Sequence, residues 1–242
     1  MSTSIFVLSA CSGDKALDAV VDCGDIDDGD RASLVSEHPD ASMEAGSLYT
    51  GAEHEHVKAA VERFDELATV DWRIISAGFG VVRPDTVLPS YECTFRDGES
   101  IRRRVETRGG DPNAMSKADR IQMIAGDIGI PTAIEEWLAE SPDILFVVLG
   151  RDYLLAADDA LSSIPDEAAA FAFAAKGTRD LIGDCEWIPF TDTERKTLQT
   201  TWTKFKGSQL RNVSENVSQV DDIMTLSGRE YRELSLQLKS TE

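Results

Sequence analysis

The sequence predicts an α/β fold: a three-layer sandwich with a mostly parallel central sheet, forming a single domain with a helical C-terminal part. Short apolar runs at 4–9, 72–77 and 143–150 have the length and composition of buried strands. Helical patterns separate these runs, and alternating strands and helices favour a parallel sheet covered on both faces. The 242 residues can bury a sizeable core, and no internal repeat or clear linker divides them.

The first strand, Ser4 to Ser9, is followed by a turn from Ala10 to Lys15. Residues 16–45 are acidic and rich in glycine, serine and proline, so we interpret them as an acidic surface insertion. Thr50, with Glu53 three positions later, has the pattern of a capping box at the start of a helix. Apolar residues at helical spacing would let this helix cover the sheet: Val57, Val61, Phe64 and Leu67.

The second strand, Trp72 to Ala77, is followed at some distance by a helical pattern over 116–140 that is interrupted near Gly129-Ile130-Pro131. The third buried strand, Asp143 to Gly150, runs directly into a helical stretch from Tyr153 to Leu161.

The rest of the chain is expected to be mostly helical. The alanine-rich run 168–175 fits either a helix or a strand, and Glu186 to Phe190 is a short fourth strand. Residues 191–242 form a helical C-terminal extension. Apolar residues at helical spacing in 220–238 indicate that this tail docks back onto the domain.

The chain is strongly acidic, with 44 aspartates and glutamates against 24 lysines and arginines and a formal net charge of −20. Lysine is scarce and the acidic residues are spread over the whole chain, so we interpret the surface as the hydrated shell of a halophilic protein. A protein that avoids polyanions is the alternative. High salt would screen charge repulsion, so the net charge does not exclude a nucleic-acid partner.

The chain is expected to be cytoplasmic, with reduced thiols and without a metal or a cofactor. Its four cysteines lack the CxxC spacing of a zinc site, and its N-terminal apolar run is a strand rather than a signal peptide. No segment approaches the roughly 20 apolar residues of a membrane span. His54 and His56, two positions apart on a helix, cannot hold one metal from the same face. The oligomeric state stays open.

The stretch from Trp72 to Phe95 is predicted to contain a binding site. Glycines beside a strand end let backbone approach a ligand closely, and prolines stiffen the loop that follows. Tyr91 could stack on a base while Glu92 accepts hydrogen bonds from a guanine-like edge; alternatively, Tyr91 completes the core and Glu92 caps a turn. Glu92 is a candidate catalytic residue, and the candidate ligand-binding residues here are Ser76, Gly78, Phe79, Gly80, Arg83, Tyr91 and Thr94.

Arg83 and Asp85 flank Pro84 and could pair across the loop, although Arg83 could equally meet a phosphate. Cys93 is interpreted as structural.

Cys11 and Lys15 are candidate catalytic residues at the carboxyl end of the first strand. If the first two strands are parallel, their carboxyl ends lie at the same sheet edge, where α/β proteins bind ligands. Hydroxyl and N–H groups of Ser9, Ser12 and Gly13 could hold an anion and favour the thiolate form of Cys11. A thiolate there could add to a nitrile, amidine or carbonyl carbon. The alternative is a small cysteine buried beneath the loop.

Residues 96–120 are the one long stretch in which basic side chains outnumber acidic ones. Arg102, Arg103 and Arg104 could contact a phosphate or a nucleic acid. Alternatively, these arginines pair with the acidic surface.

Two groups of motifs resemble the YaaA-like proteins and an uncharacterised relative of that group. Ser76 to Val82, followed by Pro84-Asp85 and Pro89 to Thr94, is similar to their strand, Ser-Ala-aromatic-Gly-Leu, Pro-Asp and Pro-Tyr-Asp pattern. Cys11 to Lys15 and Leu48 to Gly51 resemble the relative's Cys-Gly-Lys-Lys element and its Leu-Tyr-x-Gly helix start. The resemblance covers roughly the first hundred residues.

This resemblance implies a connection with nucleobases, nucleotides or nucleic acids. The YaaA-like group is associated with peroxide stress and DNA binding. One branch accompanies 7-deazaguanine modification of DNA, where it is thought to hydrate or hydrolyse a nitrile. The YaaA-like proteins keep a lysine but lack a cysteine at the position of Cys11, which favours Lys15.

Two hypotheses follow. The first is an enzyme acting on a base or nucleotide, such as a modified guanine, with Cys11, Lys15, Tyr91 and Glu92 in one pocket. The second is a non-catalytic DNA- or RNA-binding stress-response protein that uses Arg102 to Arg104.

Overall fold

The computed structural model, which describes residues 3–237, confirms the predicted three-layer α/β fold. A six-stranded sheet in the order β10-β9-β8-β1-β4-β5 forms the central layer. All neighbouring strands are parallel except β5, which runs antiparallel to β4. The strands are β1 (Ser4–Ala10), β4 (Thr69–Ser76), β5 (Gly80–Val82), β8 (Ile144–Val148), β9 (Ala169–Ala174) and β10 (Glu186–Pro189). The alanine-rich run is therefore a strand.

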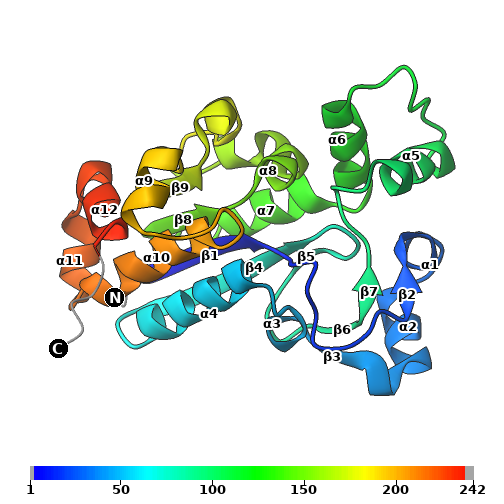
Figure 1. Ribbon diagram of the computed structural model, residues 1–242, viewed down its shortest axis with the longest axis horizontal. Helices are drawn as coiled ribbons and strands as arrows, with labels where there is room; N and C mark the ends of the chain where they lie inside the picture. The colour runs from blue at the N-terminus through cyan, green and yellow to red at the C-terminus, as the bar shows by residue number, and fades with distance from the viewer. Residues whose placement is uncertain (1–2, 238–242) are drawn as a thin grey trace.

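Alternation along β1 explains why the sheet is covered on both sides. Successive side chains of a strand point to opposite faces, so Phe6 and Leu8 enter one core while Ile5 and Val7 enter the other. Figure 1 shows α7 and α8 on one face of the sheet and α4 and α10 on the other.

The first helical layer consists of α5 (Gly98–Thr107), α6 (Lys117–Asp127), α7 (Ile130–Leu138) and α8 (Arg151–Ala157). The predicted interruption between α6 and α7 is at Gly129, whose φ of 73° lies in the left-handed region that favours glycine. Trp137 of α7 stacks on Phe6 of β1 with ring centroids 4.6 Å apart.

The second helical layer contains α4 (Ala52–Asp65), α10 (Phe205–Asn216) and α12 (Gly228–Ser235), with α9 (Asp192–Thr197) and α11 (Val220–Thr225) beside them. Phe146 of β8 packs between Phe64 of α4 and Tyr231 of α12, at centroid distances of 5.4 and 5.5 Å. The C-terminal helices thus complete the core on this face.

The predicted capping box at the start of α4 is not formed. The helix begins after Gly51, without a side-chain cap. The backbone N–H of Thr50 donates to the carbonyl of Asp14, and the carboxylate of Glu53 pairs with Lys206 of α10 at 2.7 Å. Tertiary contacts therefore hold both residues in place of the local cap.

Residues 16–45 fold more extensively than a simple surface insertion. They form β2 (Val21–Asp22), α1 (Cys23–Asp28), α2 (Arg31–Glu37), β3 (Ser42–Glu44) and the start of α3 (Ala45–Leu48). β2 pairs with β7 (Tyr91–Glu92), and β3 pairs with β6 (Val87–Pro89). Short 3-10 helices complete the fold at Pro39–Ala41, Asp158–Ser162 and Lys176–Leu181.

The expectation of reduced thiols is wrong for two of the four cysteines. Cys23 in α1 and Cys93 after β7 form a disulfide, while Cys11 and Cys185 are free. The partners are 70 positions apart, so their pairing depends on the folding of 16–45 against the loop around β7. Within residues 3–237, no helix is long and apolar enough to cross a membrane.

Candidate functional site

The candidate site lies where the connections of the sheet diverge. β1 lies between β4 and β8 in the sheet. The chain continues from β1 toward β4 and from β8 toward β9, so the loops that leave β1 and β8 turn to opposite faces of the sheet. Ligands of open α/β sheets bind at the carboxyl ends of strands at such a switch point. Cys11 follows β1 and Gly150 follows β8 at this place.

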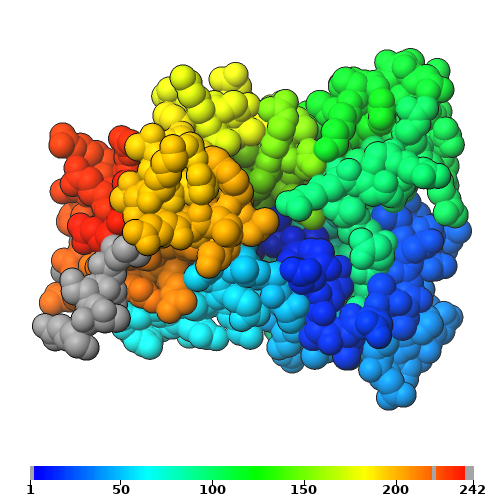
Figure 2. Space-filling view, in the orientation of Figure 1, coloured from blue at the N-terminus to red at the C-terminus, as the bar shows by residue number. Residues whose placement is uncertain are grey.

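A cavity of about 420 Å³ opens here, which we call the switch-point cavity. The dark blue N-terminal turn, the cyan start of α4 and the amber stretch near residue 200 meet on the face shown in Figure 2. The residues lining the cavity include Cys11, Ser12, Gly13, Asp14, Glu53, Glu92, Thr94, Arg96, Tyr153 and Thr203.

Cys11 forms a pair with Tyr153 on the wall of this cavity. The Cys11 Sγ and Tyr153 Oη atoms are 3.0 Å apart, and the Cys11 backbone N–H donates to the carbonyl of Ile75. Burial and the nearby Cys11 raise the pKa of Tyr153 well above its usual value. The phenol therefore keeps its proton and can donate a hydrogen bond to a Cys11 thiolate.

Ser12 and Gly13 also lie on the cavity wall. The Ser12 hydroxyl donates to the carbonyl of Asp14 and accepts from the N–H of Gly51 at the start of α4. This side chain links the turn after β1 to the covering helix and fixes the position of Cys11 beside it.

Lys15 lies beneath the turn rather than on the cavity wall. Its Nζ is 4.4 Å from the centroid of the Tyr91 ring and 3.4 Å from the carbonyl oxygens of Ser12 and Gly13. Burial lowers the pKa of Lys15, and the negative charges of Cys11, Glu92 and Asp14 oppose this effect. Lys15 is thus a partly desolvated amine within electrostatic range of Cys11.

Tyr91 is not available to stack on a ligand, which corrects the prediction made from its loop position. Its side chain has no exposed surface, and its hydroxyl is 2.7 Å from both Tyr49 Oη and Ser76 Oγ. Phe79 packs edge-on against the ring at 5.1 Å, and Lys15 covers it as well. Tyr91 therefore belongs to the core, as the alternative interpretation held.

Several other predicted ligand-binding residues are structural. Ser9 is 2 % exposed and accepts from the indole N–H of Trp72, and the fully buried Ser76 accepts from the N–H groups of Gly78 and Phe79. A Cβ on Gly78 would lie 2.9 Å from Ile26, and Gly80 has a φ of +71°. Tight packing and backbone geometry explain these glycines without a ligand.

Two predicted residues of the second loop, Glu92 and Thr94, line the switch-point cavity, and so does Arg96 from the same segment. Glu92 is exposed and lines the switch-point cavity, as Cys11 does. The Arg96 guanidinium forms no ion pair among residues 3–237. Arg83, by contrast, pairs with Asp85 at 3.5 Å on the exposed part of the loop, away from the cavity.

The three predicted nucleic-acid-binding arginines do not form a common surface. Arg104 is 2 % exposed, makes two hydrogen bonds to the carboxylate of Asp27, and donates to the carbonyl of Ala77. Arg102 donates to Asn113, and only Arg103 is exposed. For Arg104 the structure corrects the prediction: it pairs with the acidic segment, and Arg108 does the same.

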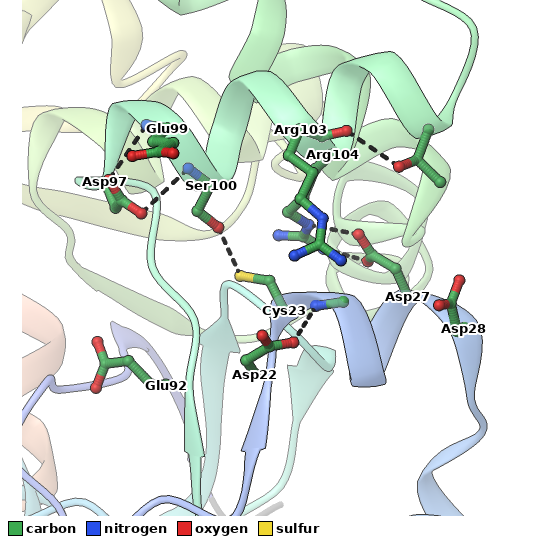
Figure 3. A pocket seen from close by; sticks show the side chains of 12 residues that line it. Asp22, Cys23, Asp27, Asp28, Glu92, Asp97, Glu99, Ser100, Arg103 and Arg104 are labelled. Atoms are coloured by element: carbon green, nitrogen blue, oxygen red, sulfur yellow. Dashed lines mark hydrogen bonds and ion pairs between the residues drawn. The ribbon is translucent and has the colours of Figure 1, made fainter.

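Arg103 and Arg104 border a second cavity, of about 330 Å³, between α1 and α5. Figure 3 shows Arg103 and Arg104 extending from α5 toward α1, with Arg104 bonded to Asp27, and Ser100 donating to the disulfide sulfur of Cys23. Most of its charged lining is acidic: Asp22, Asp27, Asp28, Glu92, Asp97 and Glu99. Glu92 borders both cavities.

The sequence interpretation missed Tyr153 and Arg96. Tyr153 stands three positions after Gly150, at the carboxyl end of a strand that was predicted, so the strand-end rule could have identified it. Arg96 was counted only as part of a basic stretch. Its position beside Thr94 gave no signal that distinguished it from its neighbours.

No group of three or more histidine, cysteine or acidic side chains in the described part of the chain could hold a metal ion. Comparisons of the chain with protein-family models, curated proteins and solved structures find no match. The YaaA-like resemblance therefore stays a prediction.

Proposed function

We propose that this protein binds a small, nitrogen-rich molecule of the nucleobase type in the switch-point cavity and acts on it through Cys11. The contact of 3.0 Å between Cys11 and Tyr153, on the wall of a cavity at the carboxyl edge of the sheet, carries the proposal. Structural cysteines are packed away from cavities, whereas a nucleophile needs both access and a proton donor. Cys185, with 7 % exposure, is an example of the former in this chain.

The proposed step is addition of the Cys11 sulfur to an electrophilic carbon, such as a nitrile on a 7-deazaguanine-type base. A bond forms between Sγ and the carbon, one π bond of the nitrile opens, and its nitrogen takes up the proton given up by the thiol. Tyr153 is placed to pass on that proton, since its phenol touches the sulfur. Water can then add to the thioimidate and release an amide and the free thiol.

Glu92 is the proposed recognition group. A carboxylate can accept two hydrogen bonds from the ring N–H and the exocyclic amine of a guanine-like edge. The cavity also contains Asp14 and Glu53, with Arg96 as a cation, so it favours a ligand that donates hydrogen bonds over a polyanion. This feature supports a free base over a nucleic-acid strand, and the pairing of Arg104 and Arg108 with Asp27 points the same way.

The test combines binding and turnover. Isothermal titration calorimetry with guanine and a nitrile-bearing 7-deazaguanine, in high-salt buffer, should detect binding, and mass spectrometry should detect the hydrated product. Cys11→Ala should abolish turnover while binding persists, and Glu92→Gln should weaken guanine binding about tenfold. Cys185→Ala is the matched control and should behave as wild type. A fully active Cys11→Ala variant, or wild-type protein that binds no base, would contradict the proposal.

A further inference from the structure

A third cavity lies in the C-terminal part of the fold, and neither Cys11 nor the disulfide cysteines line it. Its volume is about 320 Å³, and it is bounded by the end of α9, one side of α10 and His56 of α4. We call it the α9–α10 cavity. Its charged lining consists of Lys204, Arg211, His56 and Glu215, so cationic and ionisable basic groups predominate in a chain whose net charge is −20.

We propose that the α9–α10 cavity binds a small oxyanion of the phosphate type. This site is separate from the proposed function, because no residue that lines the α9–α10 cavity also lines the switch-point cavity. The turn that contains Thr203 and Lys204 forms part of the wall between them, with Thr203 on one side and Lys204 on the other.

The first support is a buried hydroxyl without a partner. Thr200 lines the cavity, is 8 % exposed, and its Oγ1 has no hydrogen-bond partner in the described part of the protein. An unsatisfied buried hydroxyl costs roughly 1–3 kcal/mol in typical proteins. The hydroxyl oxygen has almost no exposed surface, so a rotation of the Thr200 side chain toward the cavity would let a ligand oxygen accept from it and would remove this cost.

The second support is cationic charge that the protein does not neutralise. Lys204 forms no ion pair among residues 3–237, although its neighbour Lys206 pairs with Glu53. Arg211 uses Nε to bind Glu215 at 2.7 Å, which leaves its terminal N–H groups for another acceptor. Other polar groups are engaged: Ser208 donates to the carbonyl of Lys204, and Asn212 to that of Ser235.

The pKa of His56 reflects both its burial and the positive charge around the cavity. Burial lowers the pKa of His56, and the charges of Arg211 and Lys204 lower it further, while Glu215 and Glu55 oppose them. A bound dianion would supply the missing negative charge and raise the pKa of His56 again. Anion binding and protonation of His56 are therefore linked, and affinity should increase as the pH falls from 8 to 6.

The experiment measures thermal unfolding and calorimetric binding with inorganic phosphate. Sodium chloride replaces phosphate at equal ionic strength in the reference, because salt alone stabilises an acidic protein. Wild type should gain stability from phosphate over chloride. Lys204→Ala and Thr200→Val should each weaken phosphate binding about tenfold, which is the usual effect of losing one charge-assisted or buried hydrogen bond. Lys196→Ala, on α9 and paired with Asp192 outside the cavity, should bind as wild type.

A pH series with sulfate, whose charge stays constant between pH 6 and 8, isolates His56. NMR should show the imidazole pKa of His56 rising when sulfate binds, with the signal assigned through His56→Gln. The inference is overturned if phosphate stabilises no more than matched chloride, or if Lys204→Ala and Thr200→Val both bind phosphate as wild type. Both variants change side chains at the surface of a formed cavity, and their circular dichroism spectra will establish that they fold.

Discussion

At the scale of single residues, Asp27 is a carboxylate whose loss should clearly destabilise the fold. It receives hydrogen bonds from both Arg104 and Arg108, and its side chain is only 7 % exposed. Asp27→Asn would leave Arg104 buried without its counterion. Breaking a buried ion pair from one side usually costs about 3 kcal/mol or more. Urea unfolding at pH 7 should show a loss of that size.

The pH dependence of this effect has a definite sign. Burial alone would raise the pKa of Asp27, but hydrogen bonds from Arg108 and Arg104 outweigh it and lower the pKa to about 2. A lowered pKa means that the stabilisation is complete above the unfolded-state pKa and disappears as the pH falls toward 2. The difference between wild type and Asp27→Asn should therefore shrink between pH 4 and pH 2.

Asp85→Asn is the control, because Asp85 pairs with Arg83 on an exposed loop at 3.5 Å. Exposed pairs contribute roughly 0–1 kcal/mol, so this variant should be close to wild type at every pH. If Asp27→Asn loses as little free energy of unfolding as Asp85→Asn, the Asp27 ion pair does not stabilise the fold.

Residue type alone did not determine which side chains reach the site. Tyr91 and Tyr153 are both tyrosines near strand ends, yet Tyr91 is enclosed by Tyr49, Ser76 and Phe79, whereas Tyr153 touches Cys11. The enclosure of Tyr91 depends on β7 pairing with β2, a contact between segments 70 positions apart. Local sequence carries no sign of such a contact. Cys11, Ser12, Gly13, Glu92 and Thr94, by contrast, were predicted from strand ends and do line the cavity.

At the scale of elements, the packing of α10 on α4 depends on Gly207. A Cβ at this position would lie 2.5 Å from the carbonyl oxygen of Glu53 and 3.0 Å from Cβ of His56. The first contact is with backbone, which cannot turn aside as a flexible side chain can. Gly207→Ala should destabilise the protein by about 2 kcal/mol, because overpacking of helix contacts outweighs the better helix propensity of alanine.

Gly126 supplies the matched control. It also lies within a helix, α6, but a Cβ there would meet nothing within 4 Å. Gly126→Ala should stabilise the protein by about 0.5–1 kcal/mol through helix propensity alone. The two substitutions are chemically identical, so only their surroundings differ. Chemical denaturation should therefore show a lower free energy of unfolding for Gly207→Ala and a higher one for Gly126→Ala. Two stabilising results would mean that α10 does not approach α4 this closely.

Elements with their own periodic signal were predictable, and elements that depend on distant partners were not. The strands at 4–9, 72–77, 143–150 and 186–190 and the interruption at Gly129 follow from apolar runs and turn residues. Residues 16–45 gave no such signal. Their short strands exist only by pairing with β6 and β7, and the Thr50 capping box was lost to contacts with Asp14 and Lys206.

At the scale of the whole molecule, the sequence predicted the layers but not the strand order. Apolar runs show that strands are buried, but they do not say which strands are neighbours. The observed order places β1 between β4 and β8, and this arrangement brings Cys11 to Tyr153. The sequence thus located the site at the strand ends, whereas the contact of Tyr153 with Cys11 could not be predicted without the order of the strands.

The disulfide between Cys23 and Cys93 should stabilise the whole molecule, because it links α1 to the loop that leads into α5. A cross-link restricts the unfolded chain, and for a loop of 70 residues the expected gain is about 4 kcal/mol. The double variant Cys23→Ser/Cys93→Ser should lose that amount in urea unfolding. Cys185→Ser, which removes a free buried thiol, is the control for the change of cysteine to serine.

A count of free thiols tests whether the Cys23–Cys93 disulfide forms, independently of how much it stabilises the protein. Alkylation in denaturant should modify two cysteines without reductant and all four with it, because only Cys11 and Cys185 are free. Reduction of wild type should then lower its stability to that of the double variant. Four modified thiols without reductant would show that the disulfide does not form. Two modified thiols, with stability unchanged after reduction, would show that the Asp27 ion pair and the β2–β7 pairing hold 16–45 in place without the disulfide.

Reduction should also affect base binding, because Cys93 directly follows Glu92. Base binding that survives reduction would mean that β7 alone positions Glu92.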